Sequence, residues 1–362
     1  MSQSTSVQTP SWTSESIFAL VGVFALSIRL VQGWIFWGGA SRRLFYDFHS
    51  IHGTEYAVKM DPHVAGYVAN KLVHAMPGSV FPGLIQTIIQ SGGFLHFMVW
   101  FWTIAELIVG VGLILGIATR ILALGSVGLN ISLMLIFGWM GSTCVDEWTM
   151  ASAGFAMGAT LMLTGGGSWS LDHWLGRMSP ALSNRSWFRL LFSGPLSVSA
   201  TKKWGVILGI LSLLFTAAFY QYIHGAVISP LHARVNFHHY SLSLKGASAD
   251  TNGDVRFFAY VNAGPDTAKL YLIKADLING EGQNVEQWSG QQLTAISSKN
   301  IDNRFTQAWA SRFSATDYGI GGVTGAKAWI RLPGNTHLAS GNYKLRLTDI
   351  DGKHWSTVVT FK

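Results

Sequence analysis

The chain divides into two parts by its pattern of hydrophobic and polar positions. Up to about residue 228 the apolar residues occur in long runs, whereas beyond it apolar and polar residues alternate over short stretches. A helix needs about 20 apolar residues to cross a bilayer core of roughly 30 Å, so the long runs predict transmembrane helices. These runs are residues 16–37, 94–118, 120–140, 147–164 and 204–224.

The last part of the chain predicts an all-β domain. Stretches such as "VRFFAYVNA" and "NYKLRLTDI" alternate in the manner of half-buried strands, and turn signals such as "DTNGD" and "DIDGK" separate them. Short alternating strands at this spacing favour an antiparallel, Ig-like β-sandwich. The predicted domains are a four-helix membrane domain (1–178) with a long outer loop (38–93), a basic linker (179–203), a fifth transmembrane helix (204–224) and the β-sandwich (228–362).

The composition agrees with a membrane protein and excludes several classes of function. Charged residues make up 12% of the 362 residues, about half of what soluble proteins carry. A single cysteine excludes an intrachain disulfide, a Cys₄ metal site and the attachment motif of a c-type haem. The sequence has no Gly-rich nucleotide motif between a strand and a helix. We therefore expect no metal, flavin or c-type haem.

The charge distribution predicts an orientation in the membrane. The formal net charge is +7, but no basic patch is interleaved with aromatic residues, so we expect no nucleic-acid partner. The segment after the fourth predicted helix carries five cations and one acid, Asp172, which places it in the cytoplasm by the positive-inside rule. By alternation the N-terminus is cytoplasmic, and the loop 38–93, the turn at Cys144 and the β domain lie outside. The first apolar run lacks the features of a cleaved signal peptide, so we expect a retained anchor in the cytoplasmic membrane.

Three polar residues within the predicted helices form a first candidate site. At about 1.5 Å rise per residue, Arg29, Glu106 and Asn130 each lie roughly 15–18 Å from the inner end of their helices and could meet at one depth. One interpretation is a structural ion pair between Arg29 and Glu106. The other is a polar pocket that binds a quinone head group, with Glu106 as an acid that supplies protons. His96, near the outer end of the second helix, joins the candidate quinone ligands.

A second candidate site is "GSTCVDEW", residues 141–148, a short polar turn that holds the one cysteine. Cys144 is a candidate nucleophile because a polar turn is an unusual place for a cysteine that only fills space. Asp146 and Glu147 follow it closely. They are candidates for proton relay, or they are acids favoured by the dipole at the start of the fourth helix.

Several motifs carry a resemblance to a known family. The segments "IRLVQGWIFWGGASR", "AELIVGVGLILGIATR" and "GGGSWSLDHWL" occur in an order that resembles the DoxX/DoxD membrane family, which implies a four-helix core. Together with "GSTCVDEW" and the appended β domain, the chain is similar to a fusion of DoxD and DoxA, the subunits of thiosulfate:quinone oxidoreductase. The resemblance implies oxidation of two thiosulfates to tetrathionate, with two electrons passed to membrane quinone.

This resemblance gives the candidate residues their expected roles. A Cys144 thiolate would form a transient adduct with thiosulfate, which a second thiosulfate would attack to release tetrathionate. Arg42 and Arg43, at the outer end of the first helix, would bind the dianion, because guanidinium groups match oxyanions. The expected partners are thiosulfate, the quinone pool and the lipid bilayer, while a homo-oligomer and contacts with respiratory-chain components are left open. The alternative function is a non-catalytic, DoxX-like scaffold or assembly subunit of a respiratory or sulfur-metabolism complex.

Overall fold

The computed structural model describes residues 14–45, 59–140, 147–225, 228 and 234–361. Contacts within the chain divide it into two compact units. The bundle unit comprises Met1–Leu44, Phe101–Ser132 and Ala151–Ala217, and the β unit comprises Phe45–Trp100, Leu133–Met150 and Ala218–Lys362. Each unit is described by itself below.

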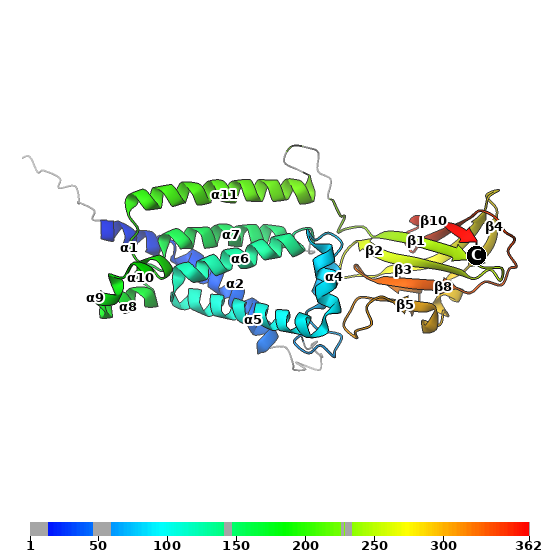
Figure 1. The fold of residues 1–362 in the computed structure, drawn as a ribbon, viewed down its shortest axis with the longest axis horizontal. Helices are drawn as coiled ribbons and strands as arrows, with labels where there is room; N and C mark the ends of the chain where they lie inside the picture. The colour runs from blue at the N-terminus through cyan, green and yellow to red at the C-terminus, as the bar shows by residue number, and fades with distance from the viewer. Residues whose placement is uncertain (1–13, 46–58, 141–146, 226–227, 229–233, 362) are drawn as a thin grey trace, which may run out of the picture. The chain divides into compact units, whose positions relative to one another are not determined.

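Each range that the sequence predicts as a transmembrane segment is helical over most of its length, and residues 116–118 and 138–140 lie beyond the ends of their helices (Figure 1). The long helices are α1 (Ser14–Phe24), α2 (Leu26–Leu44), α5 (Gly92–Leu115), α6 (Thr119–Phe137), α7 (Glu147–Thr164) and α11 (Val198–His224). Helical hydrogen bonding continues across the junction of α1 and α2, because Ala25 N–H donates to Val21 O and Ala25 O accepts from Arg29 N, both at 3.0 Å. Three short helices, α8 (Leu171–Met178), α9 (Pro180–Ser183) and α10 (Ser186–Leu191), follow α7.

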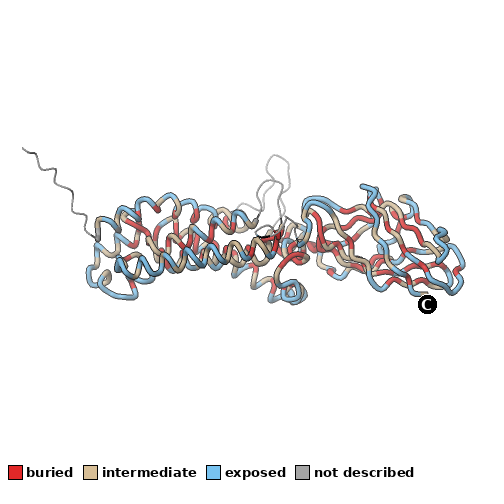
Figure 2. The backbone as a smooth tube through the Cα atoms, turned by 90° about the horizontal axis from the view of Figure 1, so that it is seen from above, coloured by how far each residue is buried: buried red, intermediate tan, exposed pale blue. Residues whose placement is uncertain are grey.

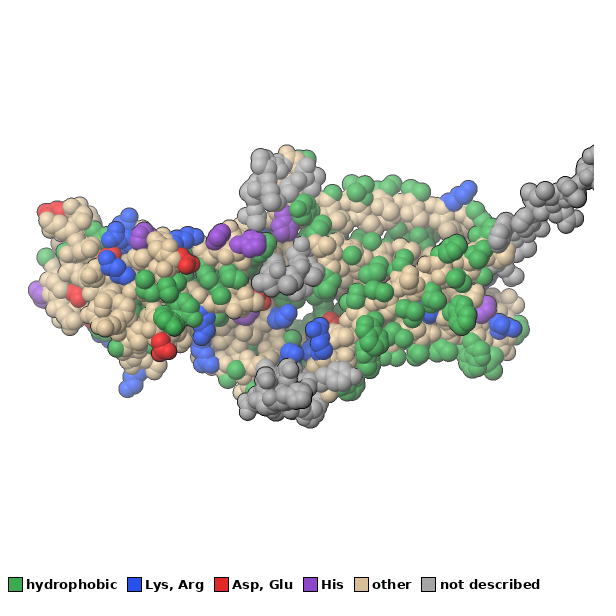
Figure 3. Space-filling view, turned by 180° about the vertical axis from the view of Figure 1, so that it is seen from behind, with side chains coloured by type: hydrophobic (Ala, Val, Ile, Leu, Met, Phe, Trp, Pro, Cys, Tyr) green, Lys and Arg blue, Asp and Glu red, His purple; other side chains and the backbone are tan. Residues whose placement is uncertain are grey.

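Three of these helices are long and apolar enough to cross a membrane, within the part of the chain that the structure describes. They are α5, α6 and α11. The helices of the bundle unit carry mainly hydrophobic side chains on the face shown in Figure 3, and Val206 and Leu213 of α11 are among the exposed ones. Such a surface suits lipid rather than water, so the helical region is that of a membrane protein.

Small residues allow the helices of the bundle unit to pack closely. A Cβ atom added to Gly33 of α2 would lie 2.9 Å from the backbone nitrogen of Ile114, and one added to Gly110 of α5 would lie 2.5 Å from the nitrogen of Trp37. The backbones of α2 and α5 are therefore in direct contact. Gly158 of α7 approaches α6 in the same way, with its added Cβ 2.6 Å from Ser126 Oγ. In lipid, this close approach is a main source of helix association.

The C-terminal domain is one ten-stranded sheet in the order β5-β8-β2-β1-β10-β9-β3-β7-β6, with β4 paired to β3. The strands are β1 (Ser241–Ala249), β2 (Val255–Ala263), β3 (Leu270–Asn279), β4 (Asn284–Trp288), β5 (Ile301–Asn303), β6 (Phe313–Thr316), β7 (Gly319–Gly322), β8 (Lys327–Leu332), β9 (Tyr343–Asp349) and β10 (His354–Phe361). Helix α12 (Gly290–Thr294) and a 3₁₀ turn (Ser298–Asn300) precede β5. Alternate residues of β2 are buried, as the sequence pattern predicts. Figure 2 shows buried, intermediate and exposed positions following one another along the strands of this domain.

Two contacts make this sheet barrel-like. The first and last strands, β1 and β10, pair in parallel, with Ser248 opposite Thr360. The end strands β5 and β6 are bridged by Asn303, whose amide donates to Phe313 O at 2.9 Å and accepts from Phe313 N at 2.8 Å. The predicted β-rich domain is confirmed, but the Ig-like sandwich is not, because the strands form one nearly closed sheet. Local alternation predicts strands and cannot reveal how the first and last strands pair.

The segment before α5 packs against the β domain within the β unit. It includes α3 (Asn70–Ala75) and α4 (Pro82–Gln90). Its buried side chains share one hydrophobic cluster with Phe305 and Trp309 of the β domain. Two further ties hold the segment in place: Trp139 Nε1 donates to Ala75 O at 2.8 Å, and Lys327 Nζ donates to Gln86 Oε1 at 2.9 Å.

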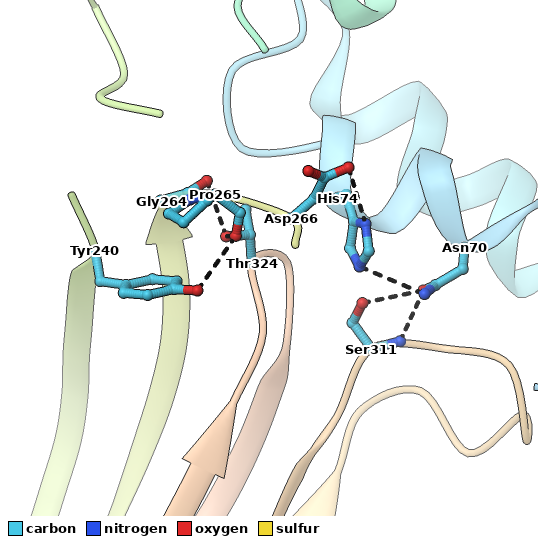
Figure 4. A network of polar contacts seen from close by, with 8 residues as sticks. All are labelled: Asn70, His74, Tyr240, Gly264, Pro265, Asp266, Ser311 and Thr324. Atoms are coloured by element: carbon cyan, nitrogen blue, oxygen red, sulfur yellow. Dashed lines mark hydrogen bonds and ion pairs between the residues drawn. The ribbon is translucent and has the colours of Figure 1, made fainter. Parts of the chain in front are cut away.

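A polar network joins α3 to the loops of the β domain (Figure 4). Asn70 Oδ1 accepts hydrogen bonds from the backbone and hydroxyl of Ser311 at 2.9 and 3.0 Å. The Asn70 amide nitrogen lies 3.4 Å from His74 Nε2, and His74 Nδ1 lies 3.9 Å from Asp266. Because an amide nitrogen only donates, His74 Nε2 is the acceptor and its proton is on Nδ1, facing Asp266.

This network predicts a pH-dependent stability of the β unit. Burial lowers the pKa of His74 below 6.5, Asp266 opposes that shift, and Lys71 adds to it. Below about pH 6.5 the unfolded chain therefore binds more protons at this position than the folded one, so the free energy of unfolding falls as the pH drops towards the lowered pKa. In His74→Gln this part of the pH dependence is lost, which thermal unfolding between about pH 7.5 and pH 5 measures.

The matched control is His337→Gln, at an exposed histidine of the same domain. It should keep the wild-type pH profile. If His74→Gln and wild type have parallel profiles, His74 makes no contribution to the pH dependence.

Candidate functional site

Among the described residues of the bundle unit, Arg43 of α2 and Glu106 of α5 form a largely buried ion pair between helices. Glu106 is 7% exposed. Its second carboxylate oxygen accepts a hydrogen bond of 2.7 Å from Trp102 Nε1, one turn earlier on α5. Gly39 makes room for the carboxylate, because a Cβ added there would lie 2.9 Å from Glu106 Oε2. Both oxygens of Glu106 are thus held by named partners.

Of the two interpretations of Arg29 and Glu106, the ion pair between them is wrong, because Glu106 pairs with Arg43. Arg29 is 2% exposed and donates instead to Trp169 O at 2.5 Å. Arg29 and Arg43 are 14 positions apart, which corresponds to roughly 21 Å along a helix, so Arg29 lies far from the position from which Arg43 reaches Glu106. The error arose because the depth calculation treats the inner ends of the two helices as level, whereas Arg29 lies beside the turn that follows α5: a Cβ added to Gly116 would overlap the Arg29 guanidinium.

Arg29 belongs to a polar cluster around the turn between α5 and α6. In this cluster Asp172 accepts from Ala118 N at 2.7 Å, Thr119 N at 3.0 Å and Ser193 Oγ at 2.6 Å. Arg120 donates to the carbonyls of Met162 and Gly194 at 3.0 and 2.8 Å. The cluster ties helix ends together and satisfies their backbone groups.

Asn130 lies at the contact between α6 and α7. Its amide donates to Ser126 O of its own helix at 2.8 Å, and a Cβ added to Gly154 of α7 would lie 2.5 Å from Asn130 Oδ1. The structure therefore places Arg29, Glu106 and Asn130 in three different sets of contacts. The expectation that they form one pocket is not supported by these contacts.

The residues predicted for thiosulfate chemistry are only partly described. Cys144 and Asp146 lie outside the described residues, and of Glu147 only its position at the start of α7 is described. Arg43 is engaged by Glu106, whereas Arg42 is exposed and donates through Nε to Gly38 O at 2.9 Å. Of the two predicted anion ligands, Arg42 is the one whose guanidinium faces solvent.

A pocket of about 410 Å³ lies in the β unit, lined by segments 62–67, 89–96 and 307–309. Most of its lining is apolar, and its polar groups include Tyr67 and His96. The rings of Tyr67 and Trp309 meet edge to face, with centroids 5.5 Å apart. The volume and the mixture of an apolar lining with a few polar groups are typical of small-molecule sites.

Hydrogen bonds fix the tautomer of the neutral His96 ring in this pocket. Trp100 Nε1 donates to His96 Nε2 at 3.1 Å, and an indole nitrogen is only a donor, so Nε2 carries no proton. The proton of the neutral ring is therefore on Nδ1, which lies 3.2 Å from Tyr67 Oη and donates to it. The Tyr67 hydroxyl keeps its own hydrogen for another acceptor. Burial raises the pKa of Tyr67 to about 12, so this hydroxyl stays protonated near neutral pH.

The sequence predicts His96 as a site residue but misses Tyr67, Trp309 and Trp102. The spacing of Trp102 and Glu106 is a detectable signal, because residues four apart share one face of a helix. Tyr67 and Trp309 have no such signal, since they are 242 positions apart and meet only in the folded chain.

A second pocket of about 480 Å³ lies on the β domain and is more polar. Its charges are largely engaged: Arg331 pairs with Asp254, and the Arg256 guanidinium lies 4.9 Å from the ring centre of Trp329. Its cations and acids are mixed, so it offers no clear preference for an anion.

The helices and the sheet define a membrane protein with a helical bundle followed by a β-rich domain. The chain belongs to the DoxD and DoxA families. The model described as "TQO small subunit DoxD" matches residues 24–198, and the model described as "TQO small subunit DoxA" matches residues 223–358. TQO stands for thiosulfate:quinone oxidoreductase. The two matches follow each other along the chain in this order, which confirms the predicted DoxD–DoxA fusion.

One solved structure shows a remote similarity. The "Structure of Iho670 Flagellar-like Filament" is 9% identical, with 45% of this chain and 98% of that chain covered and a TM-score of 0.20. A similarity this low supports no conclusion about fold or function.

The ion pair predicts an asymmetric effect of mutation. Glu106→Ala leaves Arg43 without its partner in a buried position, so we expect a loss of about 3–5 kcal/mol in the free energy of unfolding. The double variant Arg43→Ala/Glu106→Ala removes both charges and should lose less than the single variant. Thermal unfolding of the purified proteins in detergent compares them. A loss in the double variant equal to the sum of the losses in the two single variants would show that the two side chains are not coupled.

Proposed function

We propose that this protein is a membrane-bound thiosulfate:quinone oxidoreductase that joins both parts of the enzyme in one polypeptide. Two thiosulfates are oxidised to tetrathionate, and the two electrons reduce a membrane quinone. The observation that carries the proposal is the succession of a DoxD-type and a DoxA-type region in a single chain. The apolar pocket beside Tyr67 and His96 supports a lipid-soluble partner.

The proposal includes an arrangement in the cytoplasmic membrane. We take α1 and α2 together as one span, and α5, α6, α7 and α11 as the other four. Five cations follow Asp172, three before α11 and two in its first turns, and they support a cytoplasmic location of that segment by the positive-inside rule. The N-terminus is then cytoplasmic, and both the turn at Cys144 and the β domain lie outside, where thiosulfate is available.

The donor half of the reaction is assigned to the turn at Cys144. A Cys144 thiolate and the outer sulfur of thiosulfate form an S–S bond, and two electrons leave for the quinone. A second thiosulfate then attacks the outer sulfur of this adduct, which releases tetrathionate and regenerates the thiolate. Separately, we propose Arg42, whose guanidinium faces solvent, as a ligand for the thiosulfate dianion. Asp146 and Glu147 remain candidates for relaying protons.

The acceptor half needs two electrons and two protons for each quinone. We assign Glu106 a structural role here rather than the role of proton donor. Both oxygens of this carboxylate are already engaged, one by Arg43 and the other by Trp102. Its pairing keeps α2 against α5.

The proposal predicts thiosulfate-dependent reduction of a water-soluble quinone by the purified protein, with one tetrathionate for each quinol. Cys144→Ser should lower kcat by at least about 100-fold, because removal of a nucleophile removes the covalent route. Quinone absorbance and ion chromatography of tetrathionate measure the two products.

Two other outcomes of this assay distinguish the role of the thiol from the proposed function. Full activity in Cys144→Ser would retain the enzyme and exclude the thiol from its mechanism. A folded wild-type protein that is inactive with thiosulfate and quinone would contradict the proposed function.

A further inference from the structure

We infer that the quinone head group binds in the pocket between segments 62–67, 89–96 and 307–309, where the Tyr67 hydroxyl donates to one quinone carbonyl. This inference rests on the proposed function and adds to it the site of the electron acceptor. Every residue that lines the pocket belongs to the β unit.

The position of the pocket along the chain suits a ligand that arrives from the membrane. Gly92, Leu95 and His96 lie in the first turns of α5, which is long and apolar enough to cross a bilayer. The surface around that helix end exposes large apolar side chains. Phe94 and Phe97 of α5 are 51% and 59% exposed. Trp100 of α5 is also 41% exposed, and a tryptophan near a helix end is typical of the interface between lipid and water.

The hydrogen-bond pattern suits a quinone because quinone carbonyls only accept hydrogen bonds. Trp100 donates to His96, and His96 donates to Tyr67. In this row of hydrogen bonds, the Tyr67 hydroxyl is the donor that still has its hydrogen available for a ligand. Hydrogen bonds in such a chain strengthen one another. His96 therefore acts through Tyr67 as a positioning residue.

The pocket also offers an acceptor for the reduced ligand. Gln307 Oε1 is buried and has no hydrogen-bond partner among the described residues. A quinol hydroxyl can donate to it, whereas a quinone cannot. The aromatic wall of Tyr67 and Trp309 provides an apolar surface for the ring of either form.

The redox step balances within the proposed reaction. The quinone takes two electrons from two thiosulfates and two protons from water, and becomes a quinol. Tyr67 retains its own proton and stabilises the negative charge that develops on the quinone oxygen before protonation. No further oxidant or reductant is needed.

The first test separates the two substrates kinetically. Tyr67→Phe removes one hydroxyl and keeps the ring, so we expect the KM for a short-chain quinone to rise by about 2- to 12-fold, the equivalent of one hydrogen bond. The KM for thiosulfate should not change. The matched control is Tyr318→Phe, which removes an exposed hydroxyl of the β domain outside the pocket.

A second variant blocks the pocket without disturbing the core. Ala308 is exposed at the edge of the pocket, so Ala308→Trp fills space there and leaves the buried cluster intact. We expect a larger rise in the KM for quinone than in Tyr67→Phe. Ala339→Trp, at an exposed alanine elsewhere in the domain, is the control.

A double-mutant cycle tests how His96 acts. If His96 acts by orienting Tyr67, His96→Gln raises the KM for quinone in the wild-type background and has no further effect in Tyr67→Phe. Fully multiplicative effects in the double variant would contradict this role.

Binding measured without thiosulfate separates this inference from the proposed function. Calorimetric titration of the protein in detergent with the short-chain quinone should show binding that Tyr67→Phe and Ala308→Trp both weaken, even if turnover is absent. An active enzyme whose quinone KM and quinone binding are the same in both variants would overturn the pocket and leave the function intact. Equal binding of an alcohol with the same alkyl chain would also overturn it, because the head group would then contribute nothing.

Discussion

The ion pair of Arg43 with Glu106 is the interaction on which the arrangement of the bundle depends. Charges inside a membrane protein are expensive unless they are paired, so this pair fixes the position of α2 along α5. Gly33, Gly39 and Gly110 allow the two helices to approach closely enough for the pair to form. The pair itself is thus a means of setting register, and the packing around it provides the attraction between the helices.

Helix α5 contributes both to the ion pair and to the pocket. Glu106 holds the bundle unit together, while Leu95 and His96, near the start of the same helix, line the pocket of the β unit. Segment 59–100 belongs with the β domain, because Asn70, His74 and Trp309 connect them through polar and aromatic contacts. The DoxA-type domain therefore completes a pocket that the DoxD-type region alone would leave without Trp309 and Gln307.

The sequence predicted local structure well and long-range contacts poorly. Helices occur at every predicted span because long apolar runs encode them, and β2 and β9 follow the predicted alternation. Arg29 was matched with Glu106 because counting the rise from the inner helix ends assumes that those ends are level, whereas Arg29 lies beside Gly116, just after α5. The parallel pairing of β1 with β10 and the meeting of Tyr67 with Trp309 depend on the whole fold, so no local pattern reveals them.

A single turnover with quinone already bound tests most directly whether thiosulfate reduces quinone on this protein. The protein is purified from membranes in mild detergent, loaded with one equivalent of quinone, and mixed with thiosulfate in the absence of any other acceptor. We expect the bound quinone to become quinol, with one tetrathionate formed per quinol. Bound quinone that stays oxidised in the presence of excess thiosulfate would contradict this expectation.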